Sequence, residues 1–201
     1  MARYYVSPIG TMIHPWLGKP DTKFNADGLF HVDLELDGSD AEGLKDRITE
    51  AAQAALDEEL AKMKPGEAKK WSLYVPFEAE TDDDTGEETG STIFNFKQNA
   101  KIKDKKTGEM KDVKIELRDS KDNVITAAVY SGSEGRVMFS MRKIIMSSDK
   151  KVGVRLDFAK VQITKLVNGG GGGFGAVEGG YVSEGTSSQE PEGQEDDGGE
   201  Y

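Results

Sequence analysis

Polar and apolar residues alternate along much of this chain, which is the pattern of β-strands with one buried face. The clearest example is residues 30–36, where four apolar residues at even positions are separated by His31, Asp33 and Glu35. Similar patterns predict further strands at residues 3–7, 11–14, 71–77, 92–103, 113–118, 124–130, 136–143 and 152–166. Residues 15–28 are predicted to form a loop.

The last of these strands changes its alternation part-way. Its apolar positions are even up to Phe158 and odd from Val161 onward. One extra residue near Ala159 accounts for this change, so we predict a β-bulge or bend there. A long bent strand fits a closing barrel better than a flat sandwich. Together with the many short strands, it predicts a mainly β fold, built as a small barrel or a strongly curled sheet.

One long helix interrupts the strands. Ser39 and Glu42 have the spacing of a capping box, and Pro65-Gly66 ends the pattern. Between them, apolar residues recur at helical spacing at Ala41, Leu44, Ile48, Ala52, Ala55, Leu60 and Met63. The pattern favours a helix that covers one side of the sheet.

Two short polar segments are predicted to be hairpin turns. Residues 104–109 contain Asp, Lys, Thr and Gly in an order suited to a tight turn between strands. Residues 81–90 hold five acidic side chains but lack the ligand spacing of a calcium loop. We therefore interpret them as a solvated acidic hairpin tip.

The acidity of the chain is concentrated at its end. The chain has 201 residues and a net charge of −11. Residues 168–201 contain eight acids and no Lys or Arg, so residues 1–167 carry 26 bases against 37 − 8 = 29 acids. Half of the 24 glycines also lie in residues 168–201. We predict one folded domain at residues 1–167, followed by a disordered Gly-rich linker and acidic tail at residues 168–201.

The same alternation predicts a basic surface on the outside of the sheet. If Phe94 and Phe96 face the core, Lys97 faces outward, and Arg136 and Arg142 follow the same rule in their strand. The outward side chains that would form this surface are Lys97, Lys101, Lys103, Arg136 and Arg142, with Lys143 nearby. Such a surface suits a nucleic-acid backbone. Because Asp104, Glu109 and Asp112 dilute the charge, ordinary solvated strand faces are the alternative.

Exposed rings that stack on bases are the second requirement for binding single strands. Four aromatic residues break the apolar pattern and are candidates: Tyr4, Trp16, Tyr74 and Tyr130. Trp16 is the best of them, because it lies beside Lys19 in the predicted loop.

Nothing in the sequence predicts catalysis or a cofactor. The chain has no cysteine, and its two histidines, His14 and His31, have no recognisable nucleophile or metal partner. The glycine run at residues 169–173 lacks the Lys and the helix start of a phosphate-binding loop. No apolar run is long enough to span a bilayer, and we expect a soluble, cytosolic, non-enzymatic protein.

The order of several short motifs resembles that of bacteriophage single-stranded DNA-binding proteins of the short-tailed coliphage type. The motifs are Lys19-Pro20-Asp21, Val32-Asp33-Leu34, Phe94-Asn95-Phe96-Lys97, the 104–109 turn, Asp119-Ser120-Lys121, Gly132-Ser133, and the acidic tail with an aromatic last residue. The resemblance covers essentially the whole chain.

This resemblance implies an oligonucleotide-binding (OB) barrel that binds single-stranded DNA without sequence preference. It also implies that the tail contacts the phage DNA polymerase and primase-helicase and competes with DNA for the basic groove. The tail residues concerned are Glu195, Asp196, Asp197, Glu200 and Tyr201. DNA-binding bases of the family fall on Arg3, Lys97 and Arg136. A homodimer in the cytoplasm of the infected bacterial host is a further expectation.

The chain departs from the family pattern at two places. Asp27, Gly28 and Leu29 stand where a basic residue is expected, and Arg142 and Lys143 stand where an aromatic is expected. A protein-interaction adaptor, with the barrel as a scaffold for the tail, remains an alternative function, and an RNA-binding chaperone is another.

Overall fold

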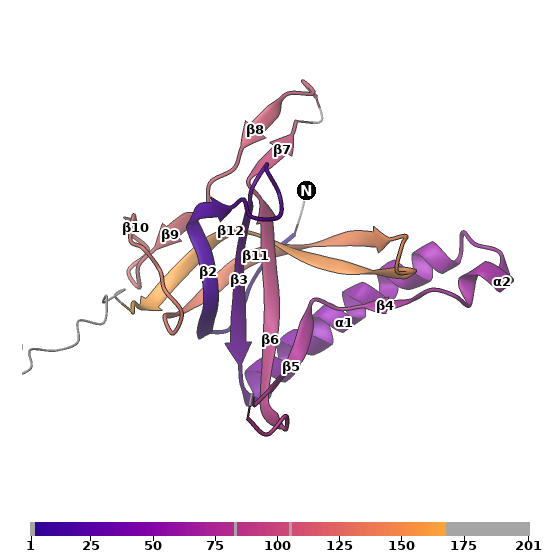
Figure 1. Cartoon of the computed structure of the whole chain (residues 1–201), viewed down its shortest axis with the longest axis horizontal. Coiled ribbons are helices and arrows are strands. Elements are labelled where there is room, and N and C mark those ends of the chain that lie inside the picture. Colours follow the sequence, from indigo (N-terminus) through magenta and orange to yellow (C-terminus); the bar gives the residue numbers. More distant parts are fainter. Residues whose placement is uncertain (1–2, 83, 105, 168–201) are drawn as a thin grey trace, which may run out of the picture. The chain divides into compact units, whose positions relative to one another are not determined.

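The structure, a computed structural model, describes residues 3–82, 84–104 and 106–167. Figure 1 shows a curled sheet with one long helix beside it. The helices are α1 (Gly38–Leu60) and α2 (Pro65–Ala68). The strands are β1 (Tyr4–Val6), β2 (Gly10–Asp21), β3 (Leu29–Leu36), β4 (Ser72–Tyr74), β5 (Phe77–Thr81), β6 (Glu88–Asn99), β7 (Lys101–Lys103), β8 (Met110–Asp112), β9 (Glu116–Arg118), β10 (Val124–Ile125), β11 (Glu134–Met146) and β12 (Lys151–Lys165).

Five long strands close into a ring. The order is β2-β3-β6-β12-β11, and β11 returns to β2 at residues 134–135. The β6–β12 pair is parallel and the other pairs in the ring are antiparallel. A closed five-stranded barrel of this kind is the architecture of the oligonucleotide-binding fold.

The core confirms the alternation expected from the sequence. Solvent hardly reaches the side chains of Phe94, Phe96, Phe139 and Phe158. The rings of Phe96 and Phe139 pack edge to face, with their centres 5.2 Å apart. The predicted bulge is also confirmed. Met138 pairs with Lys160 whereas Phe139 pairs with Phe158, which leaves Ala159 as the extra residue that reverses the parity of β12.

The helix packs its apolar face on the barrel, but its start differs from the prediction. Asp37 precedes the first helical residue, and neither it nor Ser39 forms a side-chain cap. The Asp37 carboxylate instead accepts a hydrogen bond from the Ser91 hydroxyl of β6, which competes with capping. Pro65 begins the short helix α2 rather than only ending α1, as proline at a first helical position allows.

Several strand boundaries predicted from the sequence were wrong. Of the strand predicted over residues 113–118, only β9, residues 116–118, is formed. Residues 15–21 continue β2 instead of forming a loop, with irregular pairing around Pro15. Pro76 has no N–H to donate, and the strand predicted over residues 71–77 divides around it into β4, which pairs with β12, and β5, which pairs with β6. Only Val124 and Ile125 of residues 124–130 join a strand ladder.

The predicted polar turns are confirmed. In the β7–β8 hairpin, the Asp104 N–H donates to the Glu109 carbonyl, and the Asp104 carboxylate accepts from the Lys106 and Thr107 amides. In the β5–β6 hairpin, Asp82 makes the equivalent bonds to Glu87, Asp84 and Thr85. Within the described ranges, no group of three or more His, Asp or Glu side chains is arranged to hold a metal ion. No helix in that part of the chain is long and apolar enough to cross a membrane.

Candidate nucleic-acid interface

A row of paired residues crosses the outer surface of the barrel. Strand pairing joins its members in the order Trp16, His31, Lys97, Asp157, Ser140 and Tyr4, from β2 to β1. Because neighbouring strands lie about 4.8 Å apart and every strand of the ring contributes, the row follows the curved sheet around the barrel for roughly 24 Å. Their chain neighbours Val32, Phe96, Leu156 and Phe139 are buried, so the side chains of the row point away from the core.

Each end of the row carries an exposed aromatic ring. Trp16 is 45% exposed and its indole lies 6.2 Å from the His31 ring, between ring centres. Tyr4 is 57% exposed. Exposed rings on a polar strand surface supply flat faces on which bases stack.

Cationic side chains gather at the middle of the row. Lys97 is half-buried and makes no ion pair among the residues that the structure describes. Arg142 of β11 pairs with Arg155 of β12, directly beside the row. We refer to this surface as the Lys97 face, and its side chains are Tyr4, Trp16, His31, Lys97, Asn99, Ser140, Arg142, Arg155 and Asp157.

One carboxylate holds the two arginines in place. The Nε atoms of Arg142 and Arg155 each donate to Asp157, at 2.5 Å to Oδ2 and 2.5 Å to Oδ1. Nη1 of Arg155 also donates to Oδ1 of Asn99 over 3.0 Å. Asp157 is only 17% exposed, whereas Arg142 is 51% exposed. The arginines are therefore positioned by the protein while the outer guanidinium remains accessible to an anion.

Tyr74 borders the Lys97 face from β4. It pairs with Gly153, and a Cβ at Gly153 would lie 1.9 Å from the Tyr74 carbonyl oxygen, so only glycine permits this approach. Burial raises the pKa of the Tyr74 phenol, and the Glu78 carboxylate raises it further, whereas the nearby Arg155 lowers it. The ring is thus partly withdrawn from solvent at the edge of the cationic surface.

The far end of the β3–β6 surface is acidic. Burial raises the pKa of Glu35, and repulsion from the Glu80 carboxylate adds to this shift. Glu35 lies four residues from His31 along β3, which corresponds to roughly 13 Å. On the β3–β6 surface, the cationic part therefore lies at the Lys97 end and the acidic part at the Glu35 end.

The structure separates several other predicted site residues from this surface. Lys143 points to the opposite side of β11, where its Nζ lies 2.9 Å from Glu59 and 3.2 Å from Glu58 of α1. Arg3 also lies on the helix side, where Arg3 and Arg47 stack on the Tyr5 ring at 5.1 Å and 5.5 Å. These positions leave Lys97 and Arg142 as the predicted bases that the fold brings together.

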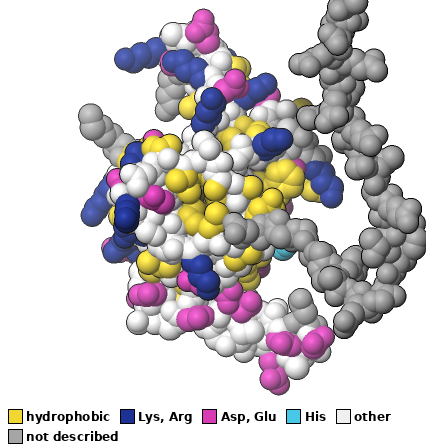
Figure 2. Space-filling view, turned by 90° about the vertical axis from the view of Figure 1, so that its left-hand side faces the viewer, with side chains coloured by type: hydrophobic (Ala, Val, Ile, Leu, Met, Phe, Trp, Pro, Cys, Tyr) yellow, Lys and Arg dark blue, Asp and Glu magenta, His cyan; other side chains and the backbone are white. Residues whose placement is uncertain are grey.

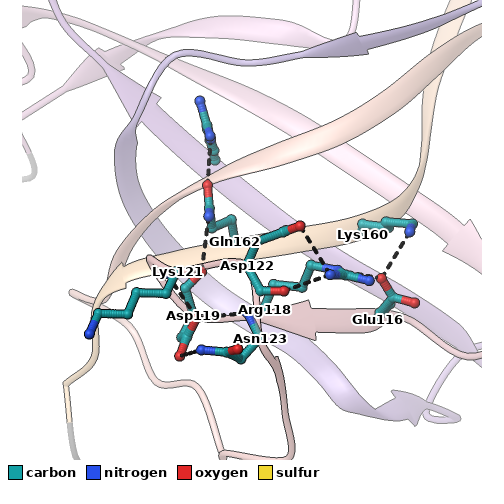
Figure 3. Close-up of polar contacts among 9 residues, drawn as sticks. Glu116, Arg118, Asp119, Lys121, Asp122, Asn123, Lys160 and Gln162 are labelled. Carbon is teal, nitrogen blue, oxygen red and sulfur yellow. Dashed lines mark hydrogen bonds and ion pairs between the residues drawn. The ribbon is translucent and has the colours of Figure 1, made fainter.

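Arg136 belongs to a second polar cluster farther along β11. Its Nε donates to Gln162 over 2.7 Å, and Gln162 donates to the Asp119 carbonyl over 2.9 Å. Figure 3 shows this chain next to the ion pairs that Glu116 forms with Arg118 and Lys160. Lys160 and Arg118 lower the pKa of Glu116. Arg136 is four residues from Ser140, so it lies roughly 13 Å from the row.

The remaining predicted bases lie near the β7–β8 hairpin, which projects from the barrel in Figure 1. Lys101 and Lys103 are exposed on β7, and Lys101 lies 3.9 Å from Asp27. Lys19 is exposed on β2 next to Trp16. The predicted tail residues Glu195, Asp196, Asp197, Glu200 and Tyr201 lie outside the described residues.

Arg155 was missed by the sequence reasoning, although a signal for it existed. The alternation of buried residues from Val152 to Phe158 already places Arg155 and Asp157 on the outer face. The sequence also gave no partner for His31. Its place between Trp16 and Lys97 depends on strand pairing, which the sequence alone does not show.

A family model described as "Single-stranded DNA-binding protein, Bacteriophage T7" matches residues 7–166. The chain belongs to this family. This confirms the family that the order of the sequence motifs predicted.

Two relatives cover most of the chain. The single-stranded DNA-binding protein of Enterobacteria phage T3 is 30% identical over an alignment of 217 positions, which covers 97% of this chain and 93% of that protein. The single-stranded DNA-binding protein of Escherichia phage T7 is 28% identical over 193 aligned positions, which cover 90% of this chain and 82% of that protein. These relatives are named for binding and not for a catalysed reaction, in agreement with the expectation of a non-enzymatic protein.

Solved structures confirm the fold. The crystal structure of gp2.5, a single-stranded DNA-binding protein encoded by bacteriophage T7, matches with a TM-score of 0.71 at 24% identity, covering 91% of this chain and all of that one. The single-stranded DNA-binding protein of bacteriophage Enc34 in complex with single-stranded DNA matches with a TM-score of 0.54 at 10% identity, covering 82% and 88%. The predicted mainly β, oligonucleotide-binding barrel is therefore correct.

Proposed function

We propose that this protein binds single-stranded DNA on the Lys97 face, without catalysis and without sequence preference. The observation that carries the proposal is the row from Trp16 to Tyr4, which has an exposed ring at each end and cations between them. Lys97, Arg142 and Arg155 neutralise phosphates, and the rings stack on bases. Binding of this kind is independent of sequence, because every nucleotide has a phosphate charge and every base has a ring face.

The names of the relatives support the same function. Both curated relatives are named single-stranded DNA-binding proteins, and the Enc34 protein was solved with single-stranded DNA. Protection of single strands during phage DNA replication and recombination, in the cytoplasm of the bacterial host, is the setting that we propose. A homodimer is also proposed, and sedimentation of the protein over a range of concentrations tests it.

A substitution at the centre of the Lys97 face tests the proposal. Lys97→Gln is expected to weaken binding to oligo-dT and to reduce the slope of log K against log salt by about 0.7, the value for one phosphate contact on a single strand. Lys45→Gln is the matched control, because Lys45 lies on α1 and pairs with Glu42. Equal affinities of the two variants would contradict the proposed face.

The acidic tail is proposed to act as a tethered competitor for the same face. A flexible linker holds a tethered ligand at effective concentrations of about millimolar. Weak attraction between the tail and the Lys97 face then suppresses non-specific binding, and a DNA strand with many contacts displaces the tail. Deletion of residues 175–201 is expected to tighten binding to oligo-dT, most clearly at low salt. Weaker binding by the truncated protein would rule out competition.

The tail is also proposed to recruit the phage DNA polymerase and the primase-helicase. Charge alone is sufficient for competition with DNA, so Tyr201 is assigned to partner docking. Tyr201→Ala is expected to reduce stimulation of the polymerase while leaving DNA affinity unchanged. Retention of full stimulation by this variant would remove the docking role of Tyr201.

A further inference from the structure

An apolar cleft of about 810 Å³ adjoins the Lys97 face at Trp16. One wall is the outer half of β2, residues 15–20, and the opposite wall is residues 125–129. Its lining includes the core residues Leu17, Phe30 and Leu117. Figure 2 shows hydrophobic side chains gathered in the middle of the side of the barrel that carries β2 and β10, with Lys and Arg side chains around them. Trp16 is therefore shared by the cleft and the Lys97 face.

The cleft lies where strand pairing does not close the barrel wall. β2 pairs with β11 only at Gly10 and Thr11, and beyond Ile13 its only strand partner among the described residues is β3. Residues 126–129 join no strand ladder within the part of the chain that the structure describes. The two segments line opposite sides of the opening without hydrogen-bonding each other as strands, so apolar side chains that a closed sheet would cover are reachable from outside.

The β9–β10 hairpin, which precedes residues 126–129, is anchored to the barrel. Gln162 of β12 donates to the Asp119 carbonyl at the turn between β9 and β10 over 2.9 Å. Asp119 in turn accepts from the Lys121 and Asn123 amides, at 2.8 Å and 2.9 Å, which keeps the turn compact (Figure 3). The chain therefore enters this wall of the cleft from a hairpin that is anchored to the barrel.

Charge at the rim matches an anionic strand with apolar faces. Three lysines line the cleft, namely Lys19, Lys101 and Lys114, against two acids, Asp27 and Asp112. Lys101 lies 3.9 Å from Asp27, whereas Lys19 and Lys114 make no ion pair among the described residues. A nucleotide needs an apolar slot for its base and a cation for its phosphate, and the cleft offers both beside the indole of Trp16.

We propose that the cleft receives at least one unstacked base of a single-stranded DNA that passes from the Lys97 face over Trp16. This inference rests on the proposed function and adds a second subsite to it. The cleft volume lies within the range of roughly 300–1,000 Å³ typical of small-ligand pockets, which is ample for a flat base. The base enters between the β2 wall and residues 126–129, and its phosphates face Lys19 and Lys114.

Filling the cleft without changing its charge tests this subsite. Gly18→Leu is suitable because Gly18 lines the cleft and an added Cβ meets no atom within 4 Å. Ala127→Leu fills the same space from the opposite wall. The measurement compares affinity for oligo-dT with affinity for an abasic oligomer of equal length, which keeps every phosphate but has no bases. Both variants are expected to lower the ratio of these affinities by about fivefold or more, since one stacked base contributes about 1–3 kcal/mol.

Gly43→Leu on α1 is the matched control, because an added Cβ at Gly43 also meets no atom within 4 Å and Gly43 lines neither the cleft nor the Lys97 face. The affinity ratio of Gly43→Leu should equal that of the unsubstituted protein, and all variants should keep the same affinity for the abasic oligomer. Thermal unfolding verifies that each variant is folded. An unchanged ratio in Gly18→Leu would overturn the base subsite. If an extended peptide occupies the cleft instead of a base, the ratio will stay unchanged. DNA affinity would still fall in Lys97→Gln in that case, so the base subsite can fail while DNA binding on the Lys97 face holds.

Discussion

Arg142 donates through Nε to Oδ2 of Asp157 over 2.5 Å, on the exposed surface where a phosphate is proposed to bind. The other oxygen of Asp157 accepts from Arg155, so a single carboxylate engages both guanidiniums. A carboxylate in this position resembles a phosphate oxygen pair in charge and geometry. Asp157 therefore orients the two arginines and at the same time competes with DNA for them.

Removal of that charge is expected to tighten DNA binding. Asp157→Asn keeps the size of the side chain but no longer attracts Arg142 and Arg155 as an anion. The variant should bind oligo-dT more tightly at low salt, and the slope of log K against log salt should steepen by up to about 0.7 for each phosphate newly neutralised. Fluorescence titration at several salt concentrations measures both quantities.

Asp33→Asn is the matched control for this prediction. Asp33 is half-buried on the outer side of β3, where it accepts a hydrogen bond from Asn95. Among the described residues it forms no ion pair with an arginine. Asp33→Asn removes one negative charge, as Asp157→Asn does, but frees no arginine from an ion pair. If the two variants changed affinity equally, general electrostatics would explain the effect and the specific competition by Asp157 would be refuted.

Trp16 is expected to report DNA binding directly. The chain has two tryptophans, and Trp71 lies partly buried with Lys150 5.1 Å from its ring. In a Trp71→Phe background, oligo-dT should quench the remaining fluorescence, because bases stack on the exposed indole. Trp16→Ala should cost about 1–3 kcal/mol in binding. Quenching that disappears with Trp71 instead of Trp16 would contradict the role of Trp16.

Gly153 is expected to be intolerant of a side chain. A Cβ at this position would lie 1.9 Å from the Tyr74 carbonyl oxygen and would push β4 away from β12. Gly153→Ala should therefore lower the free energy of unfolding by about 1–3 kcal/mol, as overpacking commonly does. Gly18→Ala is the control, because its added Cβ is unobstructed. Urea denaturation of both variants measures the difference, and equal midpoints would disprove the close approach.

Glu35 and Glu116 should make the free energy of unfolding depend on pH in opposite directions. Burial raises the pKa of Glu35, so the folded state binds this proton more tightly than the unfolded chain does. The free energy of unfolding then falls as pH rises through the interval between the unfolded and folded pKa values. Glu35→Gln should accordingly stabilise the protein above that interval and have little effect below it.

Glu116 should behave in the reverse manner. Its pKa is lowered by Lys160 and Arg118, so its contribution to stability is present above the unfolded pKa and is lost as pH falls through the folded pKa. Glu116→Gln should destabilise the protein at neutral pH and be nearly silent in acid. Urea midpoints across a pH series measure both variants, and parallel profiles would show that the carboxylate environments are wrongly assigned.

The sequence alone determined which side of each strand is buried. Alternation places Phe94 and Phe96 inside and Lys97 outside, and the change of parity in the last strand predicts the extra residue at Ala159. These features depend on neighbours in the chain, because the period of two follows from the geometry of a single strand. The order of short motifs was likewise sufficient to predict the family and the fold.

Only the tertiary structure decided which outward residues meet. Arg142 and Lys143 are adjacent in sequence, yet one joins Asp157 on the outer surface and the other joins Glu58 and Glu59 of α1. The row from Trp16 to Tyr4 draws on six strands, and its order is set by the registers of the five pairs that join them. Register depends on long-range pairing, and no local pattern in the sequence specifies it.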